Sequence, residues 1–247
     1  MSARVAVVIF PGTNSEEETL RLAQDVGIKA ELVHWSRAAT LPAYDAYILP
    51  GGFAYEDRIR AGAIPAHDPI MDSVIDGAQR GKLILGICNG AQILLEAGLV
   101  PGTGAVRVPT AAFTRNGPIP KFICERVNVR LSIDPGRCAI TAALTKDALV
   151  PAWAAHGEGR LAASPQHLQE LQIGNHIAFV YVNGAPNGSA LDAAALTNIA
   201  GNVLAIMPHP ERDGWGYNHL RENGSNHVLE ASGGAVLFKS FAKALLA

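Results

Sequence analysis

Short apolar segments alternate with amphipathic segments between residues 4 and 98, and this alternation limits the possible folds more than any other feature of the chain. The apolar segments are rich in Val, Ile and Leu, as strands buried on both faces are, and they span Arg4–Phe10, Ala30–Trp35, Ala46–Leu49 and Lys82–Ile87. Amphipathic segments that indicate helices lie at Ser15–Val26, Asp68–Ala78 and Asn89–Ala97. Strands that alternate with helices in this way predict an α/β fold, with a parallel, doubly wound sheet flanked by helices.

The first of these helices has recognisable end signals. Asn14 or Ser15 can cap its amino end, because short polar side chains there accept hydrogen bonds from free backbone amides. Glutamates at positions 16 to 18 then fill the first turn, where the helix dipole favours negative charge, and Gly27 follows the last turn. These signals place a helix directly after the turn Pro11–Asn14.

The second half of the chain is richer in strand patterns. Phe122–Leu131 alternates apolar Val and Leu with Arg and Asn, which predicts a half-buried, antiparallel strand. Ile177–Val182 and Val203–Met207 are short apolar segments of strand type, and Gly234–Leu246 has the pattern of a closing helix. No linker separates the halves. We therefore expect residues 1–247 to form a single domain, a mostly parallel sheet with antiparallel additions in its second half.

Composition excludes several classes of function. Hydrophobic residues make up 49% of the 247 residues and charged residues only 17%, a balance that favours a packed core over disorder. The net charge of −2 and the 6% aromatic content argue against nucleic-acid binding, and no apolar run is long enough to cross a membrane. The three cysteines form no C-x-x-C pair, so we expect a cytoplasmic protein without a disulfide framework or a zinc ribbon.

The segment Gly86–Gly90, with the sequence G-I-C-N-G, follows an apolar strand and opens a helix. It has the spacing of a nucleophile elbow, in which glycines on both sides allow a sharp turn that exposes the central side chain. Cys88 is then the candidate nucleophile, and the amides at the amino end of the following helix favour its thiolate form. The alternative is a buried, unreactive cysteine in a turn that needs glycine, and the segment alone leaves both open.

A nucleophilic cysteine needs a base, and His209 is the best-placed histidine. It follows the strand Val203–Met207, and sites in parallel α/β sheets collect at the carboxyl ends of strands, where Cys88 also lies. The prolines around His209 favour an extended segment, in which Glu211 points to the same side and can fix the imidazole tautomer. A surface turn is the alternative for this segment taken alone, and the elbow makes a catalytic triad the preferred interpretation.

The segment Pro50–Phe53, with the sequence P-G-G-F, ends the third predicted strand beside the fourth. Glycines let a backbone approach a substrate closely. An amide of Gly52 or Phe53, together with that of Asn89, could therefore form an oxyanion hole for a developing negative charge. A plain turn is the alternative for this segment.

Taken together, these motifs resemble those of class I glutamine amidotransferases, which use a triad of cysteine, histidine and glutamate. The resemblance rests on G-I-C-N-G-A-Q around Cys88, on H-P-E at His209 and Glu211, and on the earlier P-G-G. Longer segments fall in the order found in the PurQ family, the glutaminase subunits of phosphoribosylformylglycinamidine synthase: Pro50–Gly62, Lys121–Cys124, His156–Arg160, Pro186–Ser189 and Met207–Arg212. The resemblance extends from residue 4 to residue 212 and includes the last helix.

The resemblance implies a reaction and a division of labour between subunits. Cys88 attacks the side-chain amide of glutamine, His209 protonates the departing ammonia, and water then releases glutamate from a thioester intermediate. Gln92 and the segment His156-Gly157 help to hold the glutamine. Members of this family pass ammonia to a large synthetase subunit, often with a small third subunit, and the synthetase aminates formylglycinamide ribonucleotide in purine biosynthesis.

The chain has neither a G-x-x-x-x-G-K-[ST] nor a G-x-G-x-x-G motif, so we expect it to bind no cofactor of its own. ATP and magnesium are expected on the partner synthetase instead. No metal site is expected either, because His219, Glu222 and His227 match no standard ligand spacing. Cys124 and Cys138 are expected to be ordinary core or loop residues.

The chain also departs from the family pattern. Glu56 stands where the family usually has glycine, and we expect this change to alter its loop. The segment Asp213–Ser232 is longer than the family pattern and is a candidate part of a partner interface. Three alternatives stay open: an amidotransferase that serves another synthetase, a cysteine-dependent peptidase of the same fold, and a non-catalytic regulatory subunit. The presence of Cys88, His209 and Glu211 argues against the last of these.

Overall fold

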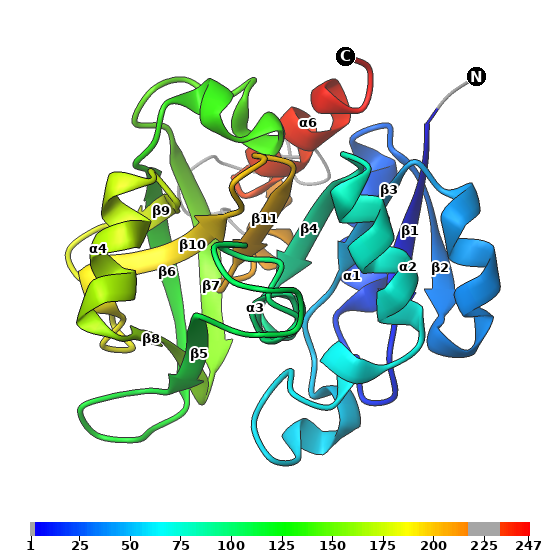
Figure 1. The fold of residues 1–247 in the computed structure, drawn as a ribbon. Helices are drawn as coiled ribbons and strands as arrows, with labels where there is room; N and C mark the ends of the chain where they lie inside the picture. The colour runs from blue at the N-terminus through cyan, green and yellow to red at the C-terminus, as the bar shows by residue number, and fades with distance from the viewer. Residues whose placement is uncertain (1–2, 217–232) are drawn as a thin grey trace.

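The computed structural model describes residues 3–216 and 233–247, and its centre is a nine-stranded sheet with the strand order β2-β1-β3-β4-β11-β10-β9-β6-β7 (Figure 1). The strands of this sheet span Arg4–Ile9 (β1), Lys29–His34 (β2), Ala46–Leu49 (β3), Leu83–Ile87 (β4), Ile123–Leu131 (β6), Leu149–His156 (β7), Ile177–Tyr181 (β9), Ala193–Thr197 (β10) and Val203–Ile206 (β11). A separate two-stranded sheet pairs β5 (Ala111–Arg115) with β8 (Glu158–Ala163).

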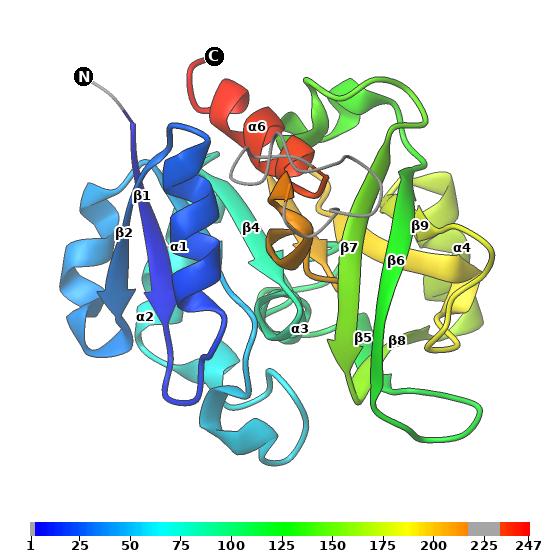
Figure 2. The same cartoon turned by 180° about the vertical axis from the view of Figure 1, so that it is seen from behind.

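Helices cover both faces of the large sheet. The helices span Glu16–Asp25 (α1), Ile70–Gln79 (α2), Asn89–Glu96 (α3), Pro165–Ile173 (α4) and Ala235–Ala244 (α6). Helices α1 and α2 lie on opposite faces of the strands β1 to β3, as the two views in Figures 1 and 2 show. This arrangement buries both faces of those strands, and the side chains of Val5, Val7 and Val8 in β1 are all fully buried.

One half of the sheet is parallel. Strand β1 pairs with β2 and β3, and β4 pairs with β3 and β11, all in the parallel sense. The carboxyl ends of β3, β4 and β11 therefore lie next to one another at one edge of the sheet. Ligand sites in open α/β sheets form at this edge, and here it receives the loops that begin at Pro50, Cys88 and Met207.

The other half of the sheet is antiparallel. Strand β10 pairs with β11 and β9, and β6 pairs with β9 and β7, all in the antiparallel sense. Strand β7 is the last strand of the sheet and contains Pro151, which has no amide hydrogen to donate. An edge strand tolerates a proline, because no further strand needs the amide hydrogen that the proline lacks.

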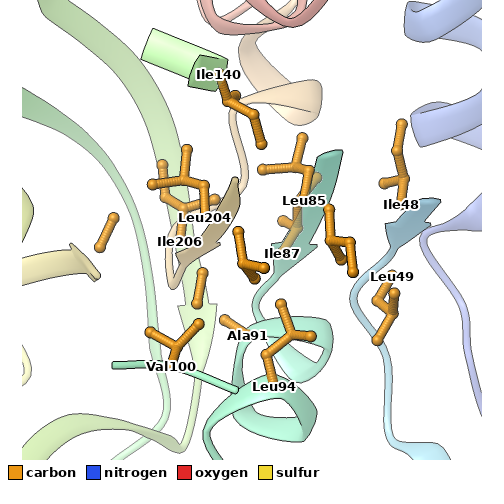
Figure 3. Packing of buried hydrophobic residues seen from close by; sticks show 14 of the residues in the cluster. Ile48, Leu49, Leu85, Ile87, Ala91, Leu94, Val100, Ile140, Leu204 and Ile206 are labelled. Carbon is orange, nitrogen blue, oxygen red and sulfur yellow. The ribbon is translucent and has the colours of Figure 1, made fainter. Parts of the chain in front are cut away.

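Apolar side chains from the central strands and α3 form the core beneath the site (Figure 3). Leu85 and Ile87 in β4 lie between the side chains of β3 on one side and those of β11 on the other (Figure 3). Ala91 and Leu94 in α3 are fully buried and pack below these strands. Truncating a buried leucine such as Leu94 to alanine typically costs about 2–5 kcal/mol, so this packing holds α3 firmly against the strand ends.

The predicted fold class is confirmed: a doubly wound parallel sheet carries antiparallel strands contributed by the second half of the chain. The antiparallel part contains two strands that the sequence did not predict, β7 and β10. The small sheet of β5 and β8 and the helix α4 were not predicted either. Within residues 3–216 and 233–247, no helix is long and apolar enough to span a membrane. The segment Asp213–Ser232 lies mostly outside the described residues, as do His219, Glu222 and His227.

The expected capping of α1 is wrong in its detail. Ser15 occupies the capping position, but its side chain accepts no hydrogen bond from the backbone amides of the helix. Its hydroxyl group instead accepts a hydrogen bond of 2.7 Å from the guanidinium of Arg212. Ser15 therefore links the first helix to the loop that carries His209 and Glu211.

Candidate active site

Cys88 lies at a sharp turn between β4 and α3. Its backbone has φ 50° and ψ −107°, which is a conformation that side chains with a Cβ atom rarely adopt. A Cβ atom at Gly86 would fall 2.7 Å from the carbonyl oxygen of Gly90, and one at Gly90 would overlap the carbonyl group of Leu49. Both glycines are therefore required for the strand and the helix to approach closely enough to form the elbow.

His209 is held in place by a neighbouring strand. Its amide donates to the carbonyl of Trp153 at 2.8 Å, and its carbonyl accepts from the amide of Trp153 at 3.0 Å. Trp153 belongs to β7, so the antiparallel half of the sheet fixes the backbone of a residue that follows the parallel strand β11. The His209 side chain is buried, with only 1% of its surface exposed.

Glu211 lies behind the imidazole of His209. One of its carboxylate oxygens, Oε1, is 2.5 Å from Nδ1 of His209, and Glu211 is completely buried. The predicted contact is therefore present, but the predicted reason is wrong. Pro210 has φ −69° and ψ −29°, so the segment turns instead of extending, and Glu211 begins a short helical turn that ends at Asp213. The turn brings the carboxylate back towards Nδ1.

Opposing effects act on the pKa of His209. Burial lowers the pKa of the imidazole, because a charged ring loses its hydration in the interior. The negative charges of Glu211 and of a Cys88 thiolate, and hydrogen bonds to both groups, outweigh burial and raise the pKa to about 10. These contacts therefore favour an imidazolium between a carboxylate and a thiolate, the state from which His209 can donate a proton.

The loop after β3 brings glycine backbone close to the side chains of both Cys88 and His209. A Cβ atom at Gly51 would fall 2.5 Å from Cε1 of His209 and 3.3 Å from Cβ of Cys88, so no larger residue fits there. Gly52 has φ +154°, and a Cβ atom on it would fall 2.6 Å from Cα of Thr13. Steric exclusion at both positions accounts for the paired glycines.

The candidate amides of the oxyanion hole have different partners. The Phe53 amide donates to the carbonyl of Gly12 at 2.9 Å. No group among the described residues accepts a hydrogen bond from the amide of Gly52. Asn89 is the first residue of α3, and the amides of a first helical turn have no acceptor within their helix. Gly52 and Asn89 are thus the pair whose amides remain available to a ligand.

Most of the predicted residues line one pocket of about 340 Å³, whereas Asn89 and Glu211 lie behind it and contact residues that line it. It is lined by Asn14, Gly52, Phe53, Asp57, Cys88, Gln92, Phe122, Ala155, His156, Gly157, Glu158, His209 and Arg212. The first five of these come from the loops after β1, β3 and β4, whereas Phe122 to Glu158 come from the antiparallel half and the small sheet. Helix α3 lies between the loop after β3 and the end of β7 (Figures 1 and 2).

Side-chain amides in the first turn of α3 connect the two walls of this pocket. Asn89 accepts from the amide of Ala54 at 3.0 Å and donates to Asp57 at 3.1 Å, both in the loop after β3. Asn89 also donates to Gln92 at 2.9 Å, and Gln92 donates to the carbonyl of Glu158 at 2.6 Å. Both amide side chains therefore fix the geometry around Cys88.

His156 lines the pocket as a neutral ring. It is buried, and neither of its ring nitrogens has a hydrogen-bond partner among the described residues. Burial and the nearby charge of His209 lower the pKa of His156 to about 4. A buried polar group without a partner is costly unless a ligand completes its hydrogen bonds, so the geometry is compatible with the predicted contact to substrate.

Asp57, Glu158 and Arg212 also line the pocket, although their sequence context predicted no role for any of them. All three lie inside motifs that carried the family resemblance, but nothing in the local sequence indicates that their side chains face one cavity. Arg212 donates to Ser15 at 2.7 Å and to Glu18 at 3.2 Å.

The other cysteines lie away from this site. Cys124 is exposed on β6 and Cys138 is buried elsewhere, where loss of hydration raises the pKa of its thiol. Cys88 is the one cysteine among the residues that line the pocket. No cluster of three or more His, Cys, Asp or Glu side chains that could hold a metal ion occurs in residues 3–216 and 233–247.

A cysteine at a strand-to-helix elbow, beside a buried histidine and glutamate at the end of the neighbouring parallel strand, defines the class of the triad-type glutamine amidotransferases. The family model for a CobB/CobQ-like glutamine amidotransferase domain matches residues 2–243. The chain is 36% identical over 244 residues to phosphoribosylformylglycinamidine synthase subunit PurQ of Trichormus variabilis, with 99% of each chain covered. It is 39% identical over 225 residues to PurQ of Methanothrix thermoacetophila, which covers 85% of this chain and 86% of that one.

A solved structure agrees with these relatives. A chain of the PurLQS structure from Thermotoga maritima superposes with a TM-score of 0.77 at 31% identity, covering 98% of this chain and 99% of that chain. The chain therefore belongs to the PurQ family of glutamine amidotransferases. The resemblance found in the sequence is confirmed.

Proposed function

We propose that this chain is the glutamine-hydrolysing subunit of a phosphoribosylformylglycinamidine synthase. The observation that carries the proposal is the placement of Cys88 at its elbow in one pocket with His209, whose imidazole is bonded to the buried Glu211. Near-complete coverage by PurQ relatives supports the same function. Each of the three side chains then has a distinct task.

The first half of the reaction forms a thioester. The Cys88 thiolate attacks the side-chain amide carbon of glutamine, and the C–N bond breaks when His209 donates a proton to the departing ammonia. Negative charge on the amide oxygen during this step is stabilised by the amides of Gly52 and Asn89. Glu211 keeps the proton-bearing Nε2 of His209 directed at the reacting atoms, because it occupies Nδ1.

The second half regenerates the enzyme. His209, now neutral, accepts a proton from water as the water attacks the thioester carbon, and the C–S bond breaks to release glutamate and the Cys88 thiolate. Gln92 and the His156-Gly157 segment hold the substrate during both halves, since they line the same pocket.

Ammonia is then used by a partner. A large synthetase subunit converts formylglycinamide ribonucleotide to formylglycinamidine ribonucleotide in purine biosynthesis and binds the ATP and magnesium that this step needs. The absence of nucleotide-binding motifs from this sequence and the similarity to a chain of PurLQS support a separate synthetase. A small third subunit completes the proposed complex. The free cysteines among the described residues fit the reducing cytoplasm in which purine synthesis would occur.

Covalent labelling tests the nucleophile. A diazo-ketone analogue of glutamine should add to Cys88 once and leave Cys124 and Cys138 unmodified, and peptide mass spectrometry reads out the position. Modification of either other cysteine with Cys88 untouched would exclude the proposed mechanism. Failure to label any cysteine in the assembled complex would favour a non-catalytic subunit.

Steady-state kinetics with and without the synthetase tests the division of labour. We expect the synthetase and its nucleotide ligands to raise glutamate release by at least about tenfold, which is a barrier change of ~1.4 kcal/mol. In Cys88→Ala, glutamine-dependent amination should be lost while amination with added ammonia continues, because the synthetase is intact. Full activity of the isolated chain would instead support a free amidase or a peptidase.

A further inference from the structure

A hydrogen bond joins the segment after β11 to the amino end of α1. Nη2 of Arg212 donates to Oγ of Ser15 at 2.7 Å, and Nε of Arg212 donates to Oε1 of Glu18 at 3.2 Å. Arg212 directly follows Glu211, and Ser15 is completely buried next to the first residue of α1. The proposed reaction gives neither Arg212 nor Ser15 a task.

The stability of α1 does not account for this hydrogen bond. Ser15 stands at the capping position, yet its side chain accepts no hydrogen bond from the amides of the helix. A side-chain cap would stabilise the helix, whereas a cation near its amino end opposes the helix dipole. Glu18, in the first turn, offsets that charge. The contact between Ser15 and Arg212 therefore needs another explanation.

The amino end of α1 also holds the loop after β3. The backbone amides of Asn14 and Ser15 both donate to the carbonyl of Gly51, at 3.3 Å and 3.2 Å. The Gly51–Gly52 peptide bond is trans, so its carbonyl and its amide, which belongs to Gly52, point in opposite directions. Anchoring the carbonyl at α1 therefore directs the Gly52 amide away from the helix, on the side where no group among the described residues accepts from it.

The orientation of this peptide group depends on its hydrogen bonds, because two glycines in succession restrict its rotation little. Ser15 lies close to the same glycine as the candidate base: a Cβ atom at Gly51 would fall 3.2 Å from Oγ of Ser15 and 2.5 Å from Cε1 of His209. The bond from Arg212 to Ser15 thus fixes the amino end of α1 relative to both the peptide group and the segment that carries His209.

We propose that Arg212 is a positioning residue: it holds Ser15 so that the amino end of α1 keeps the Gly52 amide directed at the oxygen on which negative charge develops. This inference rests on the proposed glutamine hydrolysis. Arg212 acts on the reacting atoms only through Ser15 and the carbonyl of Gly51. The contact links the two segments that must act together on a bound amide, the one that carries the base and the one that carries the oxyanion donor.

The variants Arg212→Ala and Ser15→Ala, each in the full chain assembled with its synthetase, test this role. Loss of an oxyanion donor typically lowers kcat by about 10²–10³-fold, and a donor that is present but less well oriented should cost less, about 10-fold in Arg212→Ala and about 3–10-fold in Ser15→Ala. KM for glutamine should stay within about twofold, because neither variant removes a contact to the ground state. Initial rates across a glutamine series give both constants.

Two further variants sharpen the test. The double variant should be no slower than Arg212→Ala alone, since both substitutions remove the same contact. Arg212→Lys should recover part of the lost kcat, because an ammonium group can still donate to Ser15. Arg130→Ala is the matched control: it removes the ion pair of a half-exposed arginine with Asp147, outside the pocket, and should change neither constant.

Alkylation of Cys88 by iodoacetamide separates the oxyanion donor from the triad. This reaction needs the thiolate but forms no negative charge on a carbonyl oxygen, so its rate at Cys88 should stay within about twofold in all variants. Peptide mass spectrometry distinguishes Cys88 from the exposed Cys124. An unchanged rate also shows that the elbow is folded, and Ser15→Ala, which removes only a hydroxyl group, keeps the test valid if Arg212→Ala does not fold.

An unchanged kcat in both single variants, or full additivity of their effects, would overturn the inference. A rise in KM at constant kcat would make Arg212 a substrate contact, and a parallel fall in the alkylation rate would place the effect on Cys88; either result would overturn it as well. Absence of glutamine hydrolysis by the wild-type complex is a different result, which would overturn the proposed function itself.

Discussion

The parallel and antiparallel halves of the sheet contribute differently to the pocket. The parallel half supplies the proposed reacting groups: Cys88 follows β4, His209 and Glu211 follow β11, and the glycines proposed for the oxyanion hole follow β3. The antiparallel half and the small sheet supply the opposite wall, with Phe122, the His156-Gly157 segment and Glu158. In the proposed mechanism, the first side is the reacting side and the second is the side that holds the substrate.

This difference has a structural origin. The carboxyl ends of parallel strands lie at a common edge of the sheet, so loops that are distant in sequence meet there. Tight turns after each strand then fix the positions of the reacting atoms. Antiparallel strands bring broad side-chain surfaces together but place few backbone amides at one point. The two halves meet where Trp153 of β7 pairs with the backbone of His209. Changes on the reacting side should therefore lower kcat, whereas changes on the holding side should raise KM.

The largest effects are expected at the base and its orienting carboxylate. His209→Ala should lower kcat for glutamine hydrolysis by roughly 10⁴-fold or more, and Glu211→Gln should cost about 10–100-fold less, because Glu211 only orients the ring and stabilises its charge. Glutamate release by the assembled complex measures both, and amination with added ammonia controls for an intact synthetase. Equal, complete loss in both folded variants would contradict an orienting role.

The same pair makes a prediction about pH. The Glu211 carboxylate raises the pKa of His209, so removing its charge in Glu211→Gln should lower that pKa. The protonated ring donates to ammonia, and this form is lost as pH rises through the pKa. The alkaline limb of the kcat profile should therefore move to lower pH in the variant. A limb that stays in place would show that another group controls it.

Gly51→Ala should have the next largest effect on the reacting side. The added Cβ would fall 2.5 Å from the imidazole of His209, so the ring must move away from Cys88. Displacement of a reacting group by about 1 Å can cost 10²-fold in rate, and we expect a fall in kcat of that order. Gly136→Ala is a suitable control, since its Cβ would meet only an exposed aspartate of its own turn. Similar activity of Gly51→Ala and the control would contradict the close approach at Gly51.

On the holding side, His156→Asn should raise KM for glutamine by about 5–10-fold, which corresponds to one lost hydrogen bond, with a smaller change in kcat. His156 has a pKa lowered to about 4, so it stays neutral near pH 7 and the effect on KM should be constant over that range. Initial rates across a glutamine series separate the two constants. A fall in kcat with unchanged KM would indicate that His156 acts in the reaction, and it would contradict the division of the pocket into a reacting side and a holding side.

The smallest effect concerns stability in the loop after β3. Glu56 has φ +60°, within a run of left-handed residues from Tyr55 to Asp57. Glycine adopts this conformation without the steric cost, so Glu56→Gly should stabilise the chain by about 0.5–1 kcal/mol and leave kcat unchanged. Thermal or denaturant unfolding measures the change. Glu56→Gln keeps the strain and should show no gain, and a loss of stability in Glu56→Gly would contradict the argument.

The sequence predicted the reacting side well because each of its motifs is local. A glycine-flanked cysteine after an apolar strand has few possible backbone conformations, and the structure gives Cys88 the expected elbow. The predicted strands β1 to β4 and β11 are rich in Val, Ile and Leu and are recognisable one at a time. The prediction of Glu211 beside His209 was correct in its contact but not in its cause, since the local turn at Pro210 depends on packing against β7.

The holding side was harder to predict because its segments lack strong local preferences. Strand β7 contains Pro151 and several alanines, and β10 has the sequence A-A-A-L-T, which favours a helix by propensity. Both become strands because the adjacent strands offer them backbone hydrogen bonds and a buried face, which their own residues do not signal. Asp57 and Glu158 line one cavity although about 100 positions separate them in the sequence, so their convergence depends on tertiary contacts.

The sequence by itself determined the parallel fold and the candidate triad, because those features depend on short-range patterning and on the steric freedom of glycine. Only the tertiary structure decided that Phe53 gives its amide to Gly12 while Gly52 keeps its own available. Only the tertiary structure raised the pKa of His209, lowered that of His156, and turned Ser15 from a helix cap into a partner of Arg212. Hydrogen-bond partners and desolvation depend on groups brought together from distant parts of the chain, so the local sequence does not predict them.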